Sequence, residues 1–149
     1  MAQTINNLPV GAKVKFGSLY SKQIIWKIGD KNHSGYPDNS VTLVTDQIIK
    51  MMCFDAKEPT NEESRRRSKG NNRYIYSNIR QWLNSPAGSG AWYTAQHPTD
   101  TPPNTSNVDN GVNPYDTIAG FLNAFSANER AALLNTTHVV GKSSVDGGG

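Results

Sequence analysis

The stretch "GNNRYIYSNIRQWLNS", residues 70–85, carries the densest structural signals in this chain of 149 residues. Ser77 is a suitable N-cap, because its hydroxyl can accept a hydrogen bond from a backbone N–H group one turn later. Ile79, Trp82 and Leu83 recur at positions i, i+3 and i+4, which places them on one apolar stripe of a helix. The proline that follows the stretch stops the helix. We therefore predict a short helix whose stripe, with Trp82 on it, packs on the core.

Three earlier segments have the pattern of β-strands. In "LPVGAKVKFG", residues 8–17, Val14 and Phe16 alternate with lysines, as in a half-buried strand. The same alternation runs through "QIIWKIGDKN", residues 23–32, and "VTLVTDQII", residues 41–49, is rich in β-branched side chains. Turn-forming residues separate these last two segments. The pattern predicts a small antiparallel meander.

Residues 57–72 are polar and are predicted to form a loop. They contain the basic run Arg65–Arg67, in a chain with a net charge of +3 and an isoelectric point of about 9.0. The run is either a solvated part of the loop or a site for a polyanion. No recognisable nucleic-acid-binding module accompanies it, so nucleic acid is not an expected partner.

Residues 85–116 consist mainly of small and turn-forming residues. A structureless loop of this length in a compact domain is usually functional or disordered. Its aromatic residues Trp92, Tyr93 and Tyr115 either pin the loop to the body or form a flat surface that meets a neighbouring subunit or a glycan. The aspartates and asparagines here do not have the spacing of a helix–loop–helix calcium site, so no metal site is predicted.

The segment 117–140 closes the patterned part of the chain. The apolar residues between Ile118 and Phe125 keep a helical period, and Ser126 with Glu129 forms an S-x-x-E capping box that starts a second helix. A further strand is predicted at residues 137–140.

The fold class expected from these segments is α+β. It consists of a small antiparallel sheet, two packed helices and a long loop insertion at 85–116, in one domain over residues 1–149, with a linker at 141–149. Because strand and helix stripes need the same partner layer, we expect one buried cluster made of Trp26, Ile79, Trp82, Leu83 and Phe125.

No pattern for catalysis or cofactor binding is present. Cys53 is the single cysteine and lies in the apolar stretch "KMMCF", which favours an inert thiol. No nucleophile, base and orienting group stand in a recognisable constellation. The N-terminus lacks the pattern of a signal peptide, and no apolar run approaches the ~20 residues of a membrane span. The sequence therefore predicts a protein that is not an enzyme, with no catalytic residues, cofactor or membrane span.

Three motifs resemble a bacterial and phage domain family of unknown function. They are a strand of the type I-x-W-x-V, a helix of the type S-x-I-R-x-W-L-N, and a helix start of the type A-F-S-x-x-E. The matching positions in this chain are Ile24, Trp26, Ile28, Ser77, Ile79, Arg80, Trp82, Leu83, Asn84, Phe121, Ala124, Phe125, Ser126 and Glu129.

The resemblance implies a non-enzymatic structural or adhesive component of a bacteriophage particle, in the tail or baseplate region, because members occur in clostridial phages and prophages near tail genes. The implied partners are other virion proteins in a multi-copy assembly, with a host surface glycan as a further ligand. The implied location is the virion, after synthesis in the host cytoplasm.

Other members of that family sit in bacterial surface proteins, so the alternative function is a carbohydrate-binding module of such a protein. The family continues with further strands, so this chain corresponds to its N-terminal half. The order of elements is similar to that of C-type-lectin-like modules, which is an analogy of fold only.

Overall fold

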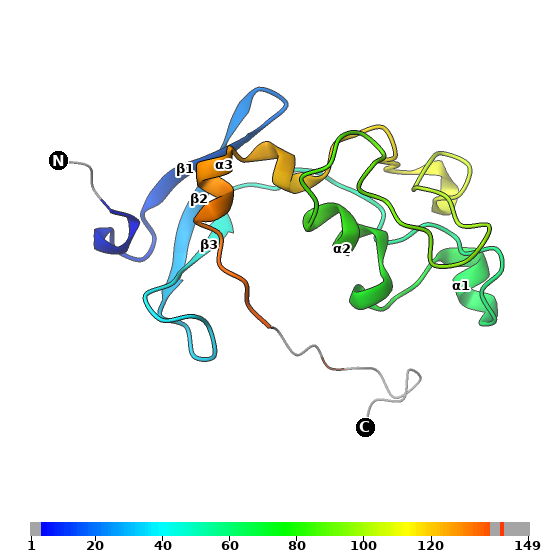
Figure 1. The fold of residues 1–149 in the computed structure, drawn as a ribbon, viewed down its shortest axis with the longest axis horizontal. Helices are drawn as coiled ribbons and strands as arrows, with labels where there is room; N and C mark the ends of the chain where they lie inside the picture. The colour runs from blue at the N-terminus through cyan, green and yellow to red at the C-terminus, as the bar shows by residue number, and fades with distance from the viewer. Residues whose placement is uncertain (1–3, 138–140, 142–149) are drawn as a thin grey trace.

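The sheet and the first two helices lie at opposite ends of an elongated molecule (Figure 1). The computed structural model describes residues 4–137 and 141. The sheet lies at one end with α3 beside it, and α1, α2 and the loop after α2 lie at the other. The predicted α+β fold with a small antiparallel sheet is confirmed. The strands and α-helices are β1 (Lys13–Leu19), β2 (Lys22–Lys31), β3 (Val41–Thr45), α1 (Ser64–Lys69), α2 (Asn78–Leu83) and α3 (Ala127–Ala131), and the 3-10 turns are η1 (Ile5–Asn7), η2 (Tyr74–Tyr76), η3 (Asp109–Gly111) and η4 (Phe121–Ala124).

The three strands form the predicted meander. Their order in the sheet is β1-β2-β3, and both neighbouring pairs are antiparallel. Ile24 and Ile28 of β2 are buried, while the lysine between them, Lys27, is exposed. On the exposed face Lys13 and Lys27 both pair with Asp46, at 2.7 and 2.8 Å, and these hydrogen bonds lower the pKa of the Asp46 carboxyl.

The helix predicted from residues 77–85 is α2. The Ser77 hydroxyl accepts a hydrogen bond from the backbone N–H of Arg80 at 3.3 Å, as expected of an N-cap. Trp82 is 3% exposed and its indole N–H donates to the carbonyl of Ala119 at 2.8 Å. The apolar stripe therefore faces the core, and the opposite side, with Arg80, faces solvent.

The helix α1 lies inside residues 57–72, which were predicted to form a loop, and that prediction is wrong over Ser64–Lys69. The helix forms because the Glu63 carboxylate accepts hydrogen bonds from the backbone N–H groups of Arg65 and Arg66, at 3.1 and 2.9 Å. An acidic cap and basic residues in the last turn both interact favourably with the helix dipole. Gly70 ends the helix with a φ of +83°.

Residues 70–72, which connect α1 to η2, lie close to the backbone of residues 55–56. A Cβ at Gly70 would lie 2.6 Å from the carbonyl oxygen of Ala56, so only glycine fits there. The Asp55 carboxylate accepts a hydrogen bond from the backbone N–H of Asn71 and another from that of Asn78, each at 2.7 Å. The side-chain carbonyl of Asn78 in turn accepts from the backbone N–H of Ala56 at 2.9 Å. These bonds fix the start of α2 against residues 55–56.

A continuous chain of aromatic rings connects the two ends of the molecule. Successive ring centroids along it are 5.1–6.3 Å apart, within the range of favourable aromatic contacts. η4 lies in the middle of this chain of rings, because its residue Phe121 contacts Trp82 on one side and Phe125 on the other. The rings in order are Trp92, Tyr115, Trp82, Phe121, Phe125 and Phe16, with Trp26 6.4 Å from Phe125.

The single buried cluster expected from the sequence matches this chain of aromatic rings only in part. Trp82 and Phe125 are buried and Trp26 belongs to the same ring chain. Ile79 and Leu83 pack against its Trp82 end. Trp26, Ile79 and Leu83 are half-buried, however, rather than mostly buried.

The capping box predicted at Ser126 and Glu129 is confirmed and starts α3. The Glu129 carboxylate accepts from the backbone N–H of Ser126 at 2.7 Å and also from that of Gly17 in β1 at 2.8 Å. The same glycine has a φ of +74°, and a Cβ on it would lie 2.5 Å from the ring of Phe125. α3 is thus attached to β1 by one carboxylate and one close ring contact.

The helix α3 ends at Ala131, and the segment before it, whose apolar residues keep a helical period, forms only the 3-10 turn η4. Residues 138–140 of the predicted strand and residues 142–149 of the predicted linker lie outside the described residues. Thr137 belongs to no helix or strand.

Trp82→Ala tests the ring chain. Removing a buried tryptophan from the centre of a packed layer should lower the free energy of unfolding by roughly 3–5 kcal/mol. The measurement is urea denaturation followed by circular dichroism. Ile75→Ala, at a side chain that is 62% exposed, is the control and should change stability by less than about 0.5 kcal/mol. Equal stability of the two variants would contradict the packing described.

Asp55 should make stability depend on pH. Burial raises the pKa of its carboxyl from the ordinary 3.8 to about 7, against the two backbone hydrogen bonds, and the nearby charges of Glu58 and Asp100 also raise it. Between pH 3.8 and about pH 7 the folded state holds a proton that the unfolded state has released. The free energy of unfolding therefore falls as the pH rises through this window.

Asp55→Asn removes this titration. The free energy of unfolding of the wild type minus that of Asp55→Asn should therefore decrease from about pH 4 to about pH 7 and stay level outside that window. Urea denaturation at a series of pH values gives this difference. The control is the free energy of unfolding of the wild type minus that of Asp38→Asn, a change at an exposed turn residue. This difference should not show the same decrease. A difference for Asp55 that rises with pH would show that the carboxylate form is the favoured one.

Gly17→Ala tests the contact between β1 and Phe125. The added methyl group meets the ring and also forces alanine into a left-handed conformation, so the expected loss is roughly 2–4 kcal/mol. Gly35→Ala is a matched control, because Gly35 has a φ of +83° and a methyl group added there would meet nothing within 4 Å. If the two variants lose equal stability in thermal unfolding, the Phe125 contact contributes nothing beyond backbone strain.

Candidate binding groove

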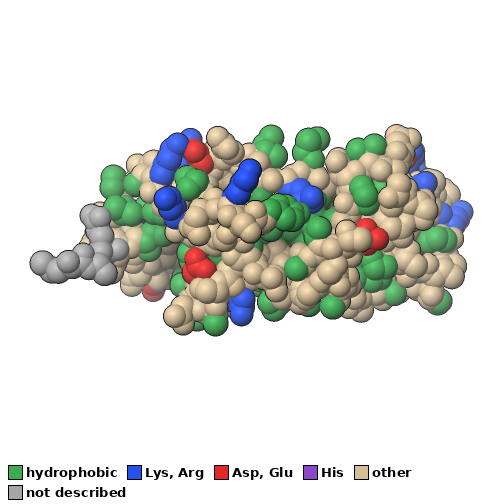
Figure 2. Space-filling view, turned by 90° about the horizontal axis from the view of Figure 1, so that it is seen from above, with side chains coloured by type: hydrophobic (Ala, Val, Ile, Leu, Met, Phe, Trp, Pro, Cys, Tyr) green, Lys and Arg blue, Asp and Glu red, His purple; other side chains and the backbone are tan. Residues whose placement is uncertain are grey.

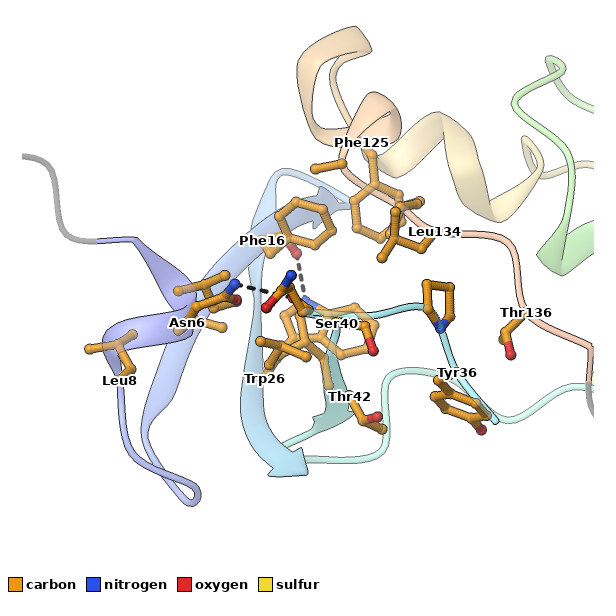
Figure 3. A pocket seen from close by; sticks show the side chains of 18 of the residues that line it. Asn6, Leu8, Phe16, Trp26, Tyr36, Ser40, Thr42, Phe125, Leu134 and Thr136 are labelled. Carbon is orange, nitrogen blue, oxygen red and sulfur yellow. Dashed lines mark hydrogen bonds between the residues drawn. The ribbon is translucent and has the colours of Figure 1, made fainter. Parts of the chain in front are cut away.

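A groove of about 730 Å³ runs between the sheet and the segment that follows α3 (Figure 3). Its walls come from η1, from all three strands, from η4 and from residues 132–136. The lining is mainly apolar and includes Leu8, Val14, Leu43, Phe121 and Leu134. The volume falls within the range of typical ligand pockets.

Trp26 lies in the middle of the groove, between the strands and the Phe125 wall (Figure 3). Its indole N–H donates to the carbonyl of Phe16 at 2.7 Å, so the polar atom of the ring is already bonded within the sheet. The tryptophan therefore offers the groove a half-buried apolar surface. Phe125 and Leu134 stand on the opposite wall, and Leu134 is 55% exposed.

Two hydroxyl groups lie in the lining without a hydrogen-bond partner among the described residues. They are Ser40 Oγ and Thr42 Oγ1, and both atoms are buried. A buried hydroxyl that bonds nothing costs about 1–3 kcal/mol. Neither atom is accessible to solvent, so a molecule in the groove can bond them only if these side chains rotate toward it.

The end of the groove near the N-terminus is tied together by polar contacts. The Asn6 amide donates to the carbonyl of Asn39 at 3.1 Å, and the Lys31 ammonium donates to the carbonyl of Asn6 at 2.7 Å. These bonds hold η1 against the turn before β3 and against the end of β2. Lys15 also lines the groove and is exposed, and it forms no ion pair with another described residue. The groove thus has one positive charge at its rim.

Trp92, Tyr93 and Tyr115 do not form the flat contact surface that was one of their two predicted roles. For Trp92 and Tyr115 that prediction is wrong. Trp92 and Tyr115 are buried and their rings stack at 5.3 Å in the core. Tyr93 is half-buried with its ring edge-on to Trp92 at 6.1 Å, and burial raises the pKa of its hydroxyl.

The segment 85–116 is held to the body by its own side chains and backbone. The Trp92 indole N–H donates to the carbonyl of Ile118 at 2.8 Å, and Gln81 exchanges two hydrogen bonds with the backbone of Thr94. This packing is the first of the two alternatives that the sequence left open, in which the aromatic residues pin the loop.

The basic run Arg65–Arg67 forms part of α1, with Arg65 and Arg67 exposed. The Arg67 guanidinium donates to the carbonyl groups of Asn61 and Glu62, at 2.7 and 2.8 Å, and so closes the turn before the helix. Figure 2 shows lysine and arginine side chains scattered along the visible face rather than gathered in one stripe.

Cys53 is half-buried beside Tyr115, and burial raises the pKa of its thiol to about 11. The thiol is therefore protonated at neutral pH, a form that is a poor nucleophile.

The sequence motifs contribute to the groove in a way that their pattern did not reveal. Trp26, Leu83 and Phe125 come from three different motifs and all line it. Ser77, Ile79 and Trp82 instead build the core behind η4, while Glu129 anchors α3 and Arg80 is exposed. The groove residues missed by sequence reasoning are those of η1, those of the turn before β3 and those after α3. The only signal after α3 was a pair of leucines, Leu133 and Leu134, beyond the helix end.

No helix among the described residues is long and apolar enough to cross a membrane.

The comparisons with known proteins identify a family for most of the chain. No match was found among curated proteins or among solved structures. A domain family of unknown function, DUF6273, matches residues 39–149. That range begins after β2, so it excludes the first motif with Trp26 and includes the positions of the other two. Over residues 39–149 the chain belongs to the DUF6273 family.

Proposed function

We propose that this chain is a non-enzymatic structural or adhesive component of a bacteriophage particle, associated with the tail or baseplate, and that its groove holds an apolar segment of a neighbouring virion protein. The observation that carries the proposal is the groove itself, a volume of about 730 Å³ lined mainly by apolar side chains. Apolar surface of this kind is stabilised by being covered with apolar surface from a partner.

The geometry favours an extended segment as the occupant. Among the described residues β3 pairs only with β2, so its outer edge is open, and Val41, Thr42 and Leu43 of β3 all line the groove. A partner strand that adds to this edge forms backbone hydrogen bonds and places alternate side chains in the groove. The charge of Lys15 at the rim favours an acidic residue on the partner.

The non-enzymatic part of the proposal rests on the polar groups. His33 and His97 each bond an aspartate, Asp30 and Asp100, at 2.7 and 2.8 Å. Among the described residues no serine, threonine or cysteine side chain is hydrogen-bonded to either ring. The arrangement thus lacks the nucleophile that a histidine base would activate.

A second candidate function is carbohydrate binding in a bacterial surface protein. The observation that favours it is the combination of Trp26 and Tyr36 with the unpartnered hydroxyls of Ser40 and Thr42 in one groove. Aromatic faces cover the apolar side of a sugar ring, and hydroxyl groups bond its oxygens. The small number of polar atoms makes this the weaker of the two candidates, since a glycan needs many hydrogen bonds.

Leu134→Asp tests the proposed function. The carboxylate would be buried by an apolar partner, so we expect at least a tenfold loss of the chain from purified particles. Particles are prepared from the strain that encodes the chain after each variant replaces the wild type, and copies per particle are counted by quantitative mass spectrometry. Val112→Asp is the control, because Val112 is 54% exposed, close to the 55% of Leu134, and does not line the groove.

Three results decide between the candidates. Equal incorporation of the two variants would reject the groove as the interface, and absence of the wild-type chain from particles would reject the virion assignment. For the second candidate, in which the chain is part of a bacterial surface protein and not of a particle, the Ser40→Ala, Thr42→Val double variant should lose binding to cell-wall polysaccharide in calorimetry.

A further inference from the structure

Three side chains that can ligate a metal ion converge beside α1. Glu58, His97 and Asp100 each offer a ligand atom, and the three atoms lie within 4.8 Å of one another. Glu58 is 3% exposed and the side chain of Asp100 is 4% exposed. Both carboxylates are therefore largely removed from water, and the ring of His97 forms the partly open side of the group.

The imidazole of His97 is oriented by Asp100. The Asp100 Oδ2 atom accepts hydrogen bonds from both the backbone N–H and the Nδ1 atom of His97, at 3.0 and 2.8 Å. Nδ1 and Asp100 Oδ2 thus share one proton, and an ion bound between these two atoms would take the place of that proton.

The Nε2 atom of His97 and the Glu58 carboxylate face the same amide. The Asn61 side chain donates to Glu58 Oε2 at 2.6 Å and lies 3.4 Å from His97 Nε2. A four-coordinate zinc ion with bonds of about 2.0–2.1 Å holds its ligands about 3.3 Å apart. The three ligand atoms, which lie within 4.8 Å of one another, would therefore move together by at most about 1.5 Å.

One buried oxygen in this group has no partner. Asp100 Oδ1 is inaccessible to solvent and forms no hydrogen bond with a described residue. Within the described part of the chain, the Glu58 carboxylate bonds only the neutral amides of Asn61 and Asn71. Among the described residues no lysine or arginine pairs with Glu58 or Asp100. Buried carboxylates are normally paired with a cation or bound to a metal.

We propose that Glu58, His97 and Asp100 bind one divalent transition-metal ion, with an imidazole nitrogen and two carboxylate oxygens as ligands. An imidazole ligand favours Zn²⁺ over Ca²⁺ or Mg²⁺, which prefer oxygen ligands alone. The ion joins residues 97–100 of the long loop to residues 58–61 before α1, so it fastens the loop to the body. No spacing in the sequence suggested this site, because Glu58 is far along the chain from the other two ligands.

Calorimetry with ZnCl₂ on chelator-treated protein tests the site. The wild type should bind one Zn²⁺, and Glu58→Gln and His97→Ala should each bind at least tenfold more weakly. His33→Ala is the matched control, because His33 also bonds an aspartate three residues away, Asp30 at 2.7 Å, but at a surface position where no third ligand is found among residues 4–137 and 141. This control should bind zinc like the wild type, and Ca²⁺ should bind the wild type at least tenfold more weakly than Zn²⁺.

Hydrogen exchange provides a readout that needs no variant. Zinc should slow amide exchange in residues 58–61 and 97–100 of the wild type and leave β1 to β3 unchanged. Weakened binding in His33→Ala with normal binding in His97→Ala would overturn the proposal, as would the absence of saturable binding, tighter binding of Ca²⁺, or protection elsewhere in the chain. Circular dichroism of each variant without metal separates a lost ligand from a lost fold.

Discussion

Contacts between aromatic rings hold the two ends of this molecule together. The rings pass from Trp92 and Tyr115 in the long loop, through Trp82 and Phe121, to Phe125 on the sheet. Each such pair contributes about 0.5–1.5 kcal/mol beyond the burial of its surface. Because η4 lies between the two ends, the placement of one short turn decides both the core around α2 and the wall of the groove.

Hydrogen bonds from the indole groups orient these rings. All three tryptophans donate their N–H to a backbone carbonyl, Trp26 to Phe16 at 2.7 Å, and Trp82 and Trp92 to Ala119 and Ile118 at 2.8 Å. Two of the acceptors are adjacent residues just before η4. The indoles of α2 and of the long loop therefore bond the same short piece of backbone. These two hydrogen bonds satisfy buried polar groups and also fix the orientation of the stacked rings.

The local features could be predicted from the sequence, and the joining of distant segments could not. Strand alternation, the Ser77 cap and the capping box with Glu129 depend on neighbours in the chain, and all appear in the structure. The helix α1 was missed because its cap, Glu63, was read as one more charge in a polar run. The groove and the burial of Trp92 depend on contacts between residues far apart in sequence, which periodicity does not encode.

The region that matches the family begins between two neighbouring strands of the sheet, β2 and β3. β3 lies inside residues 39–149, whereas its hydrogen-bonded neighbour β2 and the ring of Phe16 lie before them. A boundary drawn from sequence similarity therefore cuts through a sheet and through a layer of packed rings. A protein trimmed at that boundary would uncover a strand edge and one face of Phe125 together, and open edges beside apolar surface lead to aggregation. The hairpin of β1 and β2 thus covers one strand edge and one aromatic face of the matched region.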